Sequence, residues 1–386
     1  QILMVAGLDK YFQVARCFRD EDLRADRQPE FTQLDMEMSF VEEEDVFAAW
    51  ERAMADTWRE AMQLELALPF PRLRWEEAME RFGVDKPDMR FAVELKDVAA
   101  WARTSGFGVF TSALEAGGRV MGIALPAAHA LSRKDITALE EVAKGLGAQG
   151  LAYWKAAREG STGPLARVVP DAASAETLMT LLGAQAGDTC LFAAGKQAMV
   201  RKVLGELRNQ LGKRFQLADK KKQAFAWVTH FPLFEYDEGA GRWFSAHHPF
   251  TAPEDWTLGG EGADPGTLAS RSYDLVYNGW ELGSGSVRIH RPDVQEKVFQ
   301  ILGIDAEERR RKFGFFVDAL ASGAPPHAGF ALGLDRTVAL SLGFDNIREV
   351  VAFPKTASAT DLMCQAPSPV APEQLAEVHV KILPPA

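Results

Sequence analysis

The chain has 386 residues, of which 47% are hydrophobic and 25% are charged, as in an ordinary soluble globular protein of two to three domains. Its formal net charge of −11 repels nucleic acid, so composition alone argues against an RNA partner unless a local basic patch supplies the contact. The three cysteines form no Cys-x-x-Cys pair, which argues against a zinc knuckle, and their small number fits a reducing cytosol. No apolar run approaches 18 residues and no signal peptide precedes the first strand, so we expect a cytoplasmic protein without a membrane span.

The first elements predict an antiparallel hairpin with a long polar loop. Residues 11–19 alternate, with Phe12, Val14 and Phe18 on one face. Residues 31–40 alternate more cleanly, with the apolar side chains on one face and the polar side chains on the other. Both segments are typical of half-buried strands. The charged residues 20–30 form the loop between them.

A long amphipathic helix with acidic residues at its start is predicted from Glu42 to Leu66, and a short helix from Trp75 to Phe82. From about residue 93 to residue 222 the composition changes to Gly/Ala-rich units of short strands and helices. We interpret residues 93–222 as an inserted domain within a domain formed by residues 1–92 and 223–386. Inside the insertion we predict a strand at Gly108–Thr111 and helices at Lys134–Gly145 and Lys196–Gly212.

Strand patterns return after the insertion, together with two further helices. The predicted strands are Ala224–His230, Ser272–Tyr277, Trp280–His290 and Glu349–Phe353, and the predicted helices are Gly314–Ser322 and Asp335–Leu342. Helices and mainly antiparallel strands predict an α+β fold.

The end of the first strand carries a cluster of charged residues that suits a polyphosphate. Arginine binds phosphate oxygens in bidentate fashion, and the cluster contains several arginines. Its members are Arg19, Asp20, Glu21, Arg24, Arg27 and Gln28. A solvated charged loop is the alternative. On the polar face of the second strand, Asp35 is placed to hold an amino group, although a wet face is also ordinary in an antiparallel sheet.

Asn278-Gly279 is the strongest short signal for a β-hairpin. A two-residue turn pairs Tyr277 with Trp280, and it places Asp274 and Glu281 as diagonal neighbours on one sheet face. Two such carboxylates repel each other unless a cation lies between them, and Mg²⁺ bound to ATP phosphates is the natural candidate. Two exposed surface acids are the alternative.

Two glycines follow on the same predicted face as Glu281. Gly283 and Gly285 would leave room for a flat group such as adenine to lie on the sheet. Arg288 has the wrong parity for that face, so it needs a β-bulge, which a glycine could supply.

Two further segments suit substrate binding. His247 and His248 point in opposite directions on a regular strand, so contact with a substrate carboxylate is favoured over a shared metal. The segment Gly329–Arg336 runs into an apolar helix and puts Arg336 in its first turn, where a phosphate is favoured. A structural turn and a surface arginine are the respective alternatives. Neither GxxxxGK[ST] nor GxGxxG is present, which excludes P-loop and Rossmann fingerprints.

These residues form recognisable motifs. Phe18–Glu21 followed by Pro29–Asp35 resembles motif 2 of the class II aminoacyl-tRNA synthetases, and Gly333–Arg336 resembles motif 3. The string from Phe12 to Phe40 is similar to bacterial aspartyl-tRNA synthetases in particular, as are His247–Thr251 and Glu281–His290. The inserted domain resembles the GAD domain of that bacterial branch. The resemblance covers essentially the whole chain and implies an aspartate–tRNA ligase with the class II antiparallel sheet.

The resemblance also implies residue roles on the amino-acid side. Arg19 would bridge the α-phosphate of ATP and the aspartate carboxylate, and would stabilise charge in the transition state. Asp35 would bind the aspartate ammonium group, and His247, with His248, would close over the substrate. Arg288 would form a bidentate pair with the side-chain carboxylate of aspartate and so reject asparagine.

On the nucleotide side, the resemblance implies that Asp274 and Glu281 hold Mg²⁺ on the phosphates and that Arg336, a second catalytic residue, stacks on adenine and contacts the γ-phosphate. ATP contacts are implied for Arg19, Asp20, Glu21, Gln28, Glu281, Gly333, Leu334, Asp335 and Arg336. The implied partners are L-aspartate, tRNA(Asp), tRNA(Asn) if the enzyme is non-discriminating, and a second subunit in a homodimer, with no membrane and no DNA.

The family's anticodon-binding domain, hinge, motif 1 and capping loop are not in this sequence, so we expect a longer parent chain. Three alternatives remain at this point. One is an enzyme that charges both tRNA(Asp) and tRNA(Asn). Another is a synthetase-like module without catalysis, which should have lost the motif arginines or the acidic pair. The third is a synthetase-like asparagine synthetase, which should lack the inserted domain.

Overall fold

A computed structural model describes residues 1–20, 24–158 and 161–383. The chain divides into two compact units. The larger unit comprises Gln1–Asp9 and Met38–Gly329, and the smaller unit comprises Lys10–Glu37 and Phe330–Ala386.

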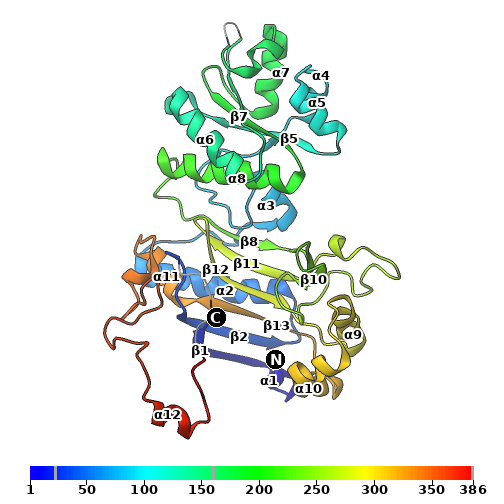
Figure 1. The fold of residues 1–386 in the computed structure, drawn as a ribbon, viewed down its shortest axis with the longest axis vertical. Helices are drawn as coiled ribbons and strands as arrows, with labels where there is room; N and C mark the ends of the chain where they lie inside the picture. Colours follow the sequence, from blue (N-terminus) through cyan, green and yellow to red (C-terminus); the bar gives the residue numbers. More distant parts are fainter. Residues whose placement is uncertain (21–23, 159–160, 384–386) are drawn as a thin grey trace. The chain divides into compact units, whose positions relative to one another are not determined.

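In the larger unit a sheet lies against one long helix (Figure 1). Its strands follow the order β12 (Trp280–Val287), β11 (Ser272–Tyr277), β8 (Phe225–Thr229) and β3 (Arg72–Arg74). β11 is antiparallel to both of its neighbours, and β3 is parallel to β8. The strands predicted at Ala224–His230, Ser272–Tyr277 and Trp280–His290 are therefore confirmed, the last with an earlier end.

The helix against this sheet is α2 (Glu43–Thr57), which continues as a π-helical turn from Trp58 to Met62. It begins with a capping box between Glu42 and Asp45, which satisfies backbone N–H groups of its first turn. Phe47 stacks on Trp227 of β8 at a centroid distance of 4.2 Å. The helix was predicted to reach Leu66 but stops at Met62, because Gln63 adopts a left-handed backbone with φ of 55°.

Outside residues 93–222, the larger unit contains further helices, two further strands and a 3₁₀ turn. They are α1 (Ile2–Val5), α3 (Trp75–Phe82), β9 (Phe234–Asp237), β10 (Arg242–Ser245), a 3₁₀ turn (Pro265–Thr267), α9 (Pro292–Ile301) and α10 (Ala306–Ala321). The predicted helices at Trp75–Phe82 and Gly314–Ser322 are confirmed, the second as part of α10.

The inserted segment, residues 93–222, contains a four-stranded sheet with helices on both faces (Figure 1). The strand order is β4 (Lys96–Asp97), β5 (Arg119–Leu125), β7 (Thr189–Gly195) and β6 (Ala152–Lys155), and all neighbours are antiparallel. The helices are α4 (Ala99–Thr104), α5 (Gly108–Glu115), α6 (Arg133–Gly145), α7 (Ala172–Leu182) and α8 (Gln197–Arg214), with 3₁₀ turns at Ala127–His129 and Pro164–Val168.

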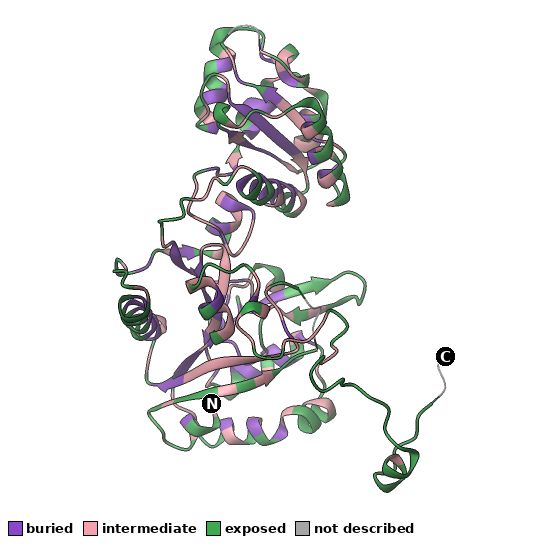
Figure 2. Ribbon diagram, turned by 90° about the vertical axis from the view of Figure 1, so that its left-hand side faces the viewer, coloured by how far each residue is buried: buried purple, intermediate pink, exposed green. Residues whose placement is uncertain are grey.

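Alternation along β5 builds two separate cores. Met121 and Ile123 pack with the buried side chains of α6 and α8, whereas Val120 packs with those of α4, α5 and α7. In Figure 2 the two central strands of this sheet, β5 and β7, are buried along most of their length. The predicted helices at Lys134–Gly145 and Lys196–Gly212 are confirmed as α6 and α8.

The strand predicted at Gly108–Thr111 is wrong, because these residues begin helix α5. Helical spacing brings Phe110 under Phe107, with ring centroids 4.8 Å apart, and buries Phe110 against the sheet. Val109, which suggested a strand, is exposed. Tertiary packing of one aromatic side chain therefore outweighs the local β propensity.

Helices α3 and α8 approach each other through glycine. A Cβ atom on Gly205 would lie 2.6 Å from the carbonyl oxygen of Gly83. We expect Gly205→Ala to lower the free energy of unfolding by about 1–3 kcal/mol, because backbone must shift to admit the methyl group. Denaturant unfolding measures the change. Gly145→Ala at the end of α6 is the control: a Cβ there meets nothing within 4 Å, so its stability should stay equal or rise. Equal effects of the two substitutions would contradict the packing argument.

In the smaller unit, β1 (Lys10–Phe18), β2 (Glu30–Ser39) and β13 (His327–Gly333) follow one another in the sheet, where β2 and β13 each extend into residues of the larger unit. Helix α11 (Leu334–Ser341) comes directly after β13, and a 3₁₀ turn (Ile347–Glu349) and α12 (Pro372–Glu377) follow. The predicted hairpin and the predicted helix at Asp335–Leu342 are confirmed.

Two predictions in this unit are wrong. β1 is a strand but is not half-buried on its apolar face, since Phe12, Val14 and Phe18 are 72%, 65% and 75% exposed. No strand forms at residues 349–353, where a 3₁₀ turn ends and Phe353 has a left-handed φ of 59° that interrupts an extended backbone.

Candidate active site

The turn between β11 and β12 fixes the position of two carboxylates. Asn278 and Gly279 both have positive φ, as a two-residue hairpin turn of the I′ kind requires. Tyr277 pairs with Trp280 and Val276 pairs with Glu281, as the sequence predicts.

A β-bulge follows directly and changes the parity of β12. Leu275 pairs with Gly283, so Leu282 is the extra residue, and Asp274 pairs with Ser284. Asp274, Glu281 and Ser284 therefore share one face of the sheet. Continued alternation brings Arg288 to this face as well, and its Nη1 atom donates a hydrogen bond to Ser286 Oγ at 2.9 Å.

The bulge overturns the predicted role of the two glycines. Gly283 pairs with Leu275 and Gly285 pairs with Tyr273, so both glycines lie on the opposite face from Glu281. That is the face on which Tyr273 contacts Phe47 of α2, with ring centroids 4.9 Å apart. A flat platform for adenine at these glycines is therefore wrong. The bulge needed for Arg288 exists, but it lies at Leu282 and not at a glycine.

Asp274 is a buried acid in an unfavourable environment. Its side chain is 7% exposed, and Oδ1 has no hydrogen-bond partner within the part of the chain that the structure describes. Burial raises the pKa of Asp274 well above its ordinary value, and the charge of Glu281 raises it further. Lys86 Nζ lies 4.0 Å from Glu281 Oε2 and is the cation at this pair.

The pair opens into a small cavity of about 190 Å³. Its lining is Trp75, Asp85, Phe231, Pro232, Glu235, Ala246, His247, Asp274, Glu281 and Ser284. Among the described residues no group of three or more His, Cys, Asp or Glu side chains is arranged to hold a metal ion by itself. The two carboxylates suit Mg²⁺, which binds oxygen ligands and usually takes its remaining ligands from water and substrate phosphates. The unpartnered Oδ1 of Asp274 fits such a cation.

The two histidines contact different neighbours, as their adjacent positions predict. The ring of His247 packs edge-on against Phe231 at 4.7 Å and lines the acidic cavity. His248 Nδ1 accepts a hydrogen bond from the Phe250 backbone N–H at 3.3 Å. Surrounding protein atoms lower the pKa of both imidazoles, although both reach the surface, and the positive charge of Arg288 lowers the pKa of His248 further. Both rings are therefore neutral at pH 7 and can exchange hydrogen bonds with a ligand.

In the smaller unit, Arg19 and Asp35 share one face of the hairpin. Cys17 Sγ donates to Gln33 Oε1 across the strands at 3.2 Å, which fixes the odd-numbered residues of β1 and β2 on the same face. The guanidinium of Arg19 lies over the ring of Phe31, 5.6 Å from its centroid. Arg19 is exposed and Asp35 is partly exposed, so both can meet a ligand.

The loop between β1 and β2 is tied to α11. Arg336 Nε donates to the Asp26 carbonyl oxygen at 3.1 Å, and Asp335 Oδ2 accepts from the Thr32 backbone N–H at 2.8 Å. Gly333 is the N-cap of α11, and Leu334 is 37% exposed at its first position. The structure thus brings the predicted motif residues of the loop and of the helix together within this unit.

Gln28 is buried, and its side-chain amide forms hydrogen bonds with the backbone of Lys355. Its Oε1 atom accepts from the Lys355 N–H at 2.7 Å, and its Nε2 atom donates to the Lys355 carbonyl at 3.4 Å. The Lys355 ammonium lies 2.6 Å from Glu30 Oε1, which keeps the pKa of Glu30 below its ordinary value. Asp20 is exposed at the end of β1, and Glu21 lies outside the described residues.

Several residues of the site were not predicted from the sequence. Ser284 carries no chemical signature, and only the bulge reveals that it faces Asp274. Asp85 and Lys86 lie in a linker without periodicity, so nothing in the sequence placed them near Glu281. Lys355 follows the segment that was wrongly predicted as a strand.

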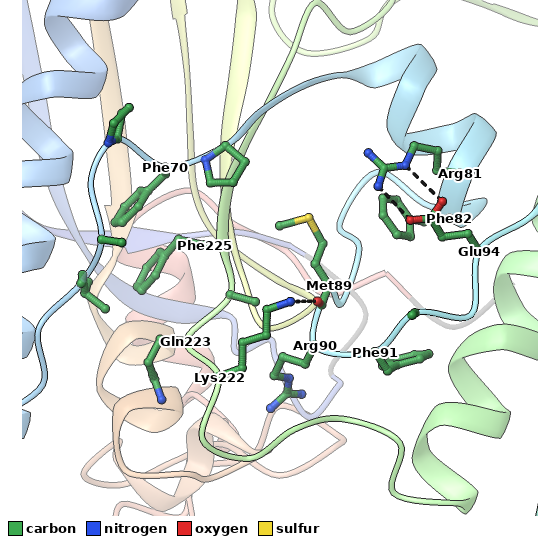
Figure 3. A pocket seen from close by; sticks show the side chains of 16 residues that line it. Phe70, Arg81, Phe82, Met89, Arg90, Phe91, Glu94, Lys222, Gln223 and Phe225 are labelled. Carbon is green, nitrogen blue, oxygen red and sulfur yellow. Dashed lines mark hydrogen bonds and ion pairs between the residues drawn. The ribbon is translucent and has the colours of Figure 1, made fainter. Parts of the chain in front are cut away.

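A second cavity, of about 600 Å³, lies where the inserted segment joins the rest of the larger unit (Figure 3). Its lining includes the stacked rings of Phe70 and Phe225. It also includes Arg81 and Glu94, which form an ion pair at 2.8 Å. None of the predicted site residues lines this cavity. Within the described residues, no helix is both long enough and apolar enough to cross a membrane.

Comparison with known proteins agrees with these motifs. Residues 1–357 match the family of class II tRNA synthetases (D, K and N). Aspartate–tRNA(Asp/Asn) ligases of Bacillus mycoides and Bacillus cereus are each 52% identical to the chain over 385 residues, and that of Bacillus cytotoxicus is 51% identical. Each alignment covers 99% of this chain and 65% of the relative, so the chain spans about two thirds of the length of these relatives. The chain belongs to the class II tRNA synthetase family of the D, K and N type.

Proposed function

We propose that the chain is the catalytic part of an aspartate–tRNA ligase. The observation that carries the proposal is the bulge at Leu282, which puts the acidic pair and Arg288 on one face of the sheet. One face then offers a metal site for phosphates and a guanidinium for a carboxylate. The relatives named as aspartate–tRNA(Asp/Asn) ligases support the same reading.

The first proposed step joins aspartate to ATP. A carboxylate oxygen of aspartate attacks the α-phosphorus in line, the bond to the bridging oxygen breaks, and pyrophosphate leaves. Arg19 stabilises the charge that develops on the α-phosphate, and Arg336 contacts the γ-phosphate. In the second step the terminal adenosine hydroxyl of tRNA takes the aspartyl group and AMP leaves. Catalysis is positioning and electrostatics, without a covalent enzyme intermediate.

Recognition of aspartate is assigned to Arg19, Asp35, His247, His248 and Arg288. Asp35 binds the ammonium group, and Arg288 pairs with the side-chain carboxylate through two parallel hydrogen bonds. Ser286, bonded to Arg288 at 2.9 Å, orients the guanidinium. The imidazoles of His247 and His248 are assigned to close over the substrate.

For the nucleotide, we assign the metal to Asp274 and Glu281. Bound there, Mg²⁺ would neutralise phosphate charge on ATP. The loop residues Asp20 and Glu21, together with Gly333 and Leu334, are assigned to ATP contacts. Gln28 and Asp335 are assigned to ATP contacts as well, and they have a second, structural role. Because Gln28 binds the backbone of Lys355 and Asp335 binds the backbone of Thr32, they hold the loop between β1 and β2 in place.

A second candidate activity is the charging of both tRNA(Asp) and tRNA(Asn), which the names of the relatives favour. Attachment of radiolabelled aspartate to each purified tRNA, in the presence of ATP and Mg²⁺, separates the candidates. Labelling of both tRNAs supports the dual enzyme, and labelling of tRNA(Asp) alone supports the discriminating one. Absence of aspartate-dependent activity on either tRNA, with the chain folded and ATP bound, would contradict the ligase proposal.

We further propose that residues 93–222 are a GAD domain, that the enzyme works in the cytoplasm and that it forms a homodimer. The exposed apolar stripe of Phe12, Val14 and Phe18 on β1 supports a protein interface in the assembled enzyme, because such stripes are rarely left in water. The inactive-module alternative is disfavoured because Arg19, Arg336 and the acidic pair are all present.

A further inference from the structure

The positive charge of the inserted segment is concentrated on one side of its sheet. Residues 126–150 and 196–222, which contain α6 and α8 and are called here the α6/α8 layer, hold 12 Lys and Arg against 5 Asp and Glu. The other parts of the segment, residues 93–125 and 151–195, hold 6 against 7. Outside the α6/α8 layer the whole chain holds 31 against 49. One layer of an acidic protein therefore carries an excess of basic residues, although two of them, Arg201 and Arg208, are buried and do not contribute to its surface.

Four exposed cations gather where two helix ends of this layer meet. Arg133 and Lys134 begin α6, and Lys213 and Arg214 end α8. Arg214 Nη2 lies 2.7 Å from Asp135 Oδ1, which joins the two helix ends. We name these four residues the basic corner. Asp135 is already engaged as the capping partner of Ser132, so it neutralises only Arg214.

Two of these cations stand where helix electrostatics disfavours them. The N-terminal end of a helix carries partial positive charge, so Arg133 and Lys134 in the first turn of α6 cost stability. The acids further along α6 do not offset them, because Glu140 and Glu141 pair with Lys144 at 3.1 and 3.0 Å. A bound polyanion would explain cations at this position, since helix N-termini and arginine both bind phosphate.

The more obvious basic run, Lys220–Lys222, is only partly available. Lys222 Nζ donates to the Met89 carbonyl at 2.6 Å and points into the cavity of Figure 3. Lys222 therefore serves the junction of the inserted segment, while Lys220 and Lys221 remain exposed beyond the end of α8.

We propose that the basic corner binds phosphates of the tRNA backbone. The proposal rests on the proposed function, because it takes tRNA as the substrate. With 31 basic against 49 acidic residues, the rest of the chain carries a net negative charge, which disfavours RNA. Phosphate contacts of this kind position an RNA without reading its sequence. The inserted segment thus supplies the local basic patch that the net charge of −11 requires.

The test neutralises one cation from each helix end, Arg133→Gln together with Lys213→Gln, in the 386-residue chain. Arg214 is retained because it holds Asp135. Binding to a tRNA(Asp) transcript is measured by fluorescence anisotropy at several KCl concentrations. We expect the affinity to fall about tenfold and the slope of log K against log salt to become shallower by about 2, since each lost phosphate contact removes close to one unit.

The matched control is Arg103→Gln together with Arg167→Gln. Both residues are exposed and belong to the part of the inserted segment outside the α6/α8 layer, and the change in net charge is the same. The control should bind tRNA as the unmodified chain does. Equal losses in the two double variants, or no loss in either, would overturn the proposal.

Aspartate-dependent exchange between ATP and pyrophosphate keeps this proposal separate from the proposed function, because the exchange needs no tRNA. Both double variants should retain the exchange of the unmodified chain. If the unmodified chain shows no exchange while only the basic-corner variant loses RNA binding, the ligase proposal fails and the RNA contact stands. If exchange is present and the basic-corner variant binds RNA as the unmodified chain does, the ligase proposal stands and the proposed RNA contact fails.

Discussion

Replacing Asp274 by Asn should abolish aspartate activation without weakening the fold. The amide keeps the size of the side chain but cannot serve as an anionic ligand for Mg²⁺ beside Glu281. We expect the rate of exchange between ATP and pyrophosphate to fall at least about 100-fold, which corresponds to roughly 2.7 kcal/mol of lost transition-state stabilisation. The exchange rate at saturating Mg²⁺ measures the loss.

The stability of the folded Asp274→Asn variant should not fall with its activity, and we expect it to stay equal or to rise. Because burial raises the pKa of Asp274 above its ordinary value of 3.8, there is a pH range between 3.8 and the raised pKa in which the folded chain without a bound metal holds a proton that the unfolded chain releases. The contribution of this group to stability is therefore lost as the pH rises from 3.8 through the raised pKa, and Asn avoids that loss. At neutral pH the variant should unfold at the same or a higher temperature. Asp345→Asn, at an exposed acid, is the control and should change neither property. An active Asp274→Asn enzyme would refute the metal assignment.

The second large effect is expected from Arg288→Lys. Lysine keeps the charge but cannot form two parallel hydrogen bonds with a carboxylate, and it loses the contact with Ser286. A lost hydrogen bond to a charged group costs about 1.5–3 kcal/mol, so the KM for aspartate should rise roughly 10- to 100-fold. The KM for ATP should stay unchanged. Exchange kinetics with each substrate varied in turn measure both constants.

Arg291→Lys is the matched control for this prediction. Arg291 lies three residues further on, where it is exposed and pairs with Asp293 at 2.7 Å. Its replacement should leave both KM values as they are. If Arg288→Lys raises both constants alike, Arg288 is not the carboxylate-binding residue, and a general distortion of β12 is the better explanation.

The sequence was sufficient where a local signal decided the structure. Asn278-Gly279 predicted the pairing of Tyr277 with Trp280, and hence the neighbouring acids, because two residues with positive φ leave one hairpin register. The helices α3, α6 and α8 were predictable from apolar periodicity within one or two residues.

It was insufficient where distant contacts decided the outcome. The bulge at Leu282 changes which side chains of β12 face Asp274, and the neighbouring Gly283 does not by itself predict which residue is the extra one. Phe110 draws the β-rich segment Gly108–Thr111 into a helix because an aromatic core in the inserted segment receives it. The burial of Gln28 against Lys355, 327 residues away in sequence, is likewise a tertiary event.

Exchange between ATP and pyrophosphate with aspartate, asparagine or glutamate as the amino acid tests the central claim most directly. The chain is mixed with ATP, Mg²⁺ and labelled pyrophosphate, and the appearance of label in ATP is followed. We predict exchange with aspartate alone, because Arg288 is proposed to pair with a carboxylate at the length of the aspartate side chain. Exchange with asparagine in place of aspartate, or no exchange from a folded chain that binds ATP, would contradict the assignment.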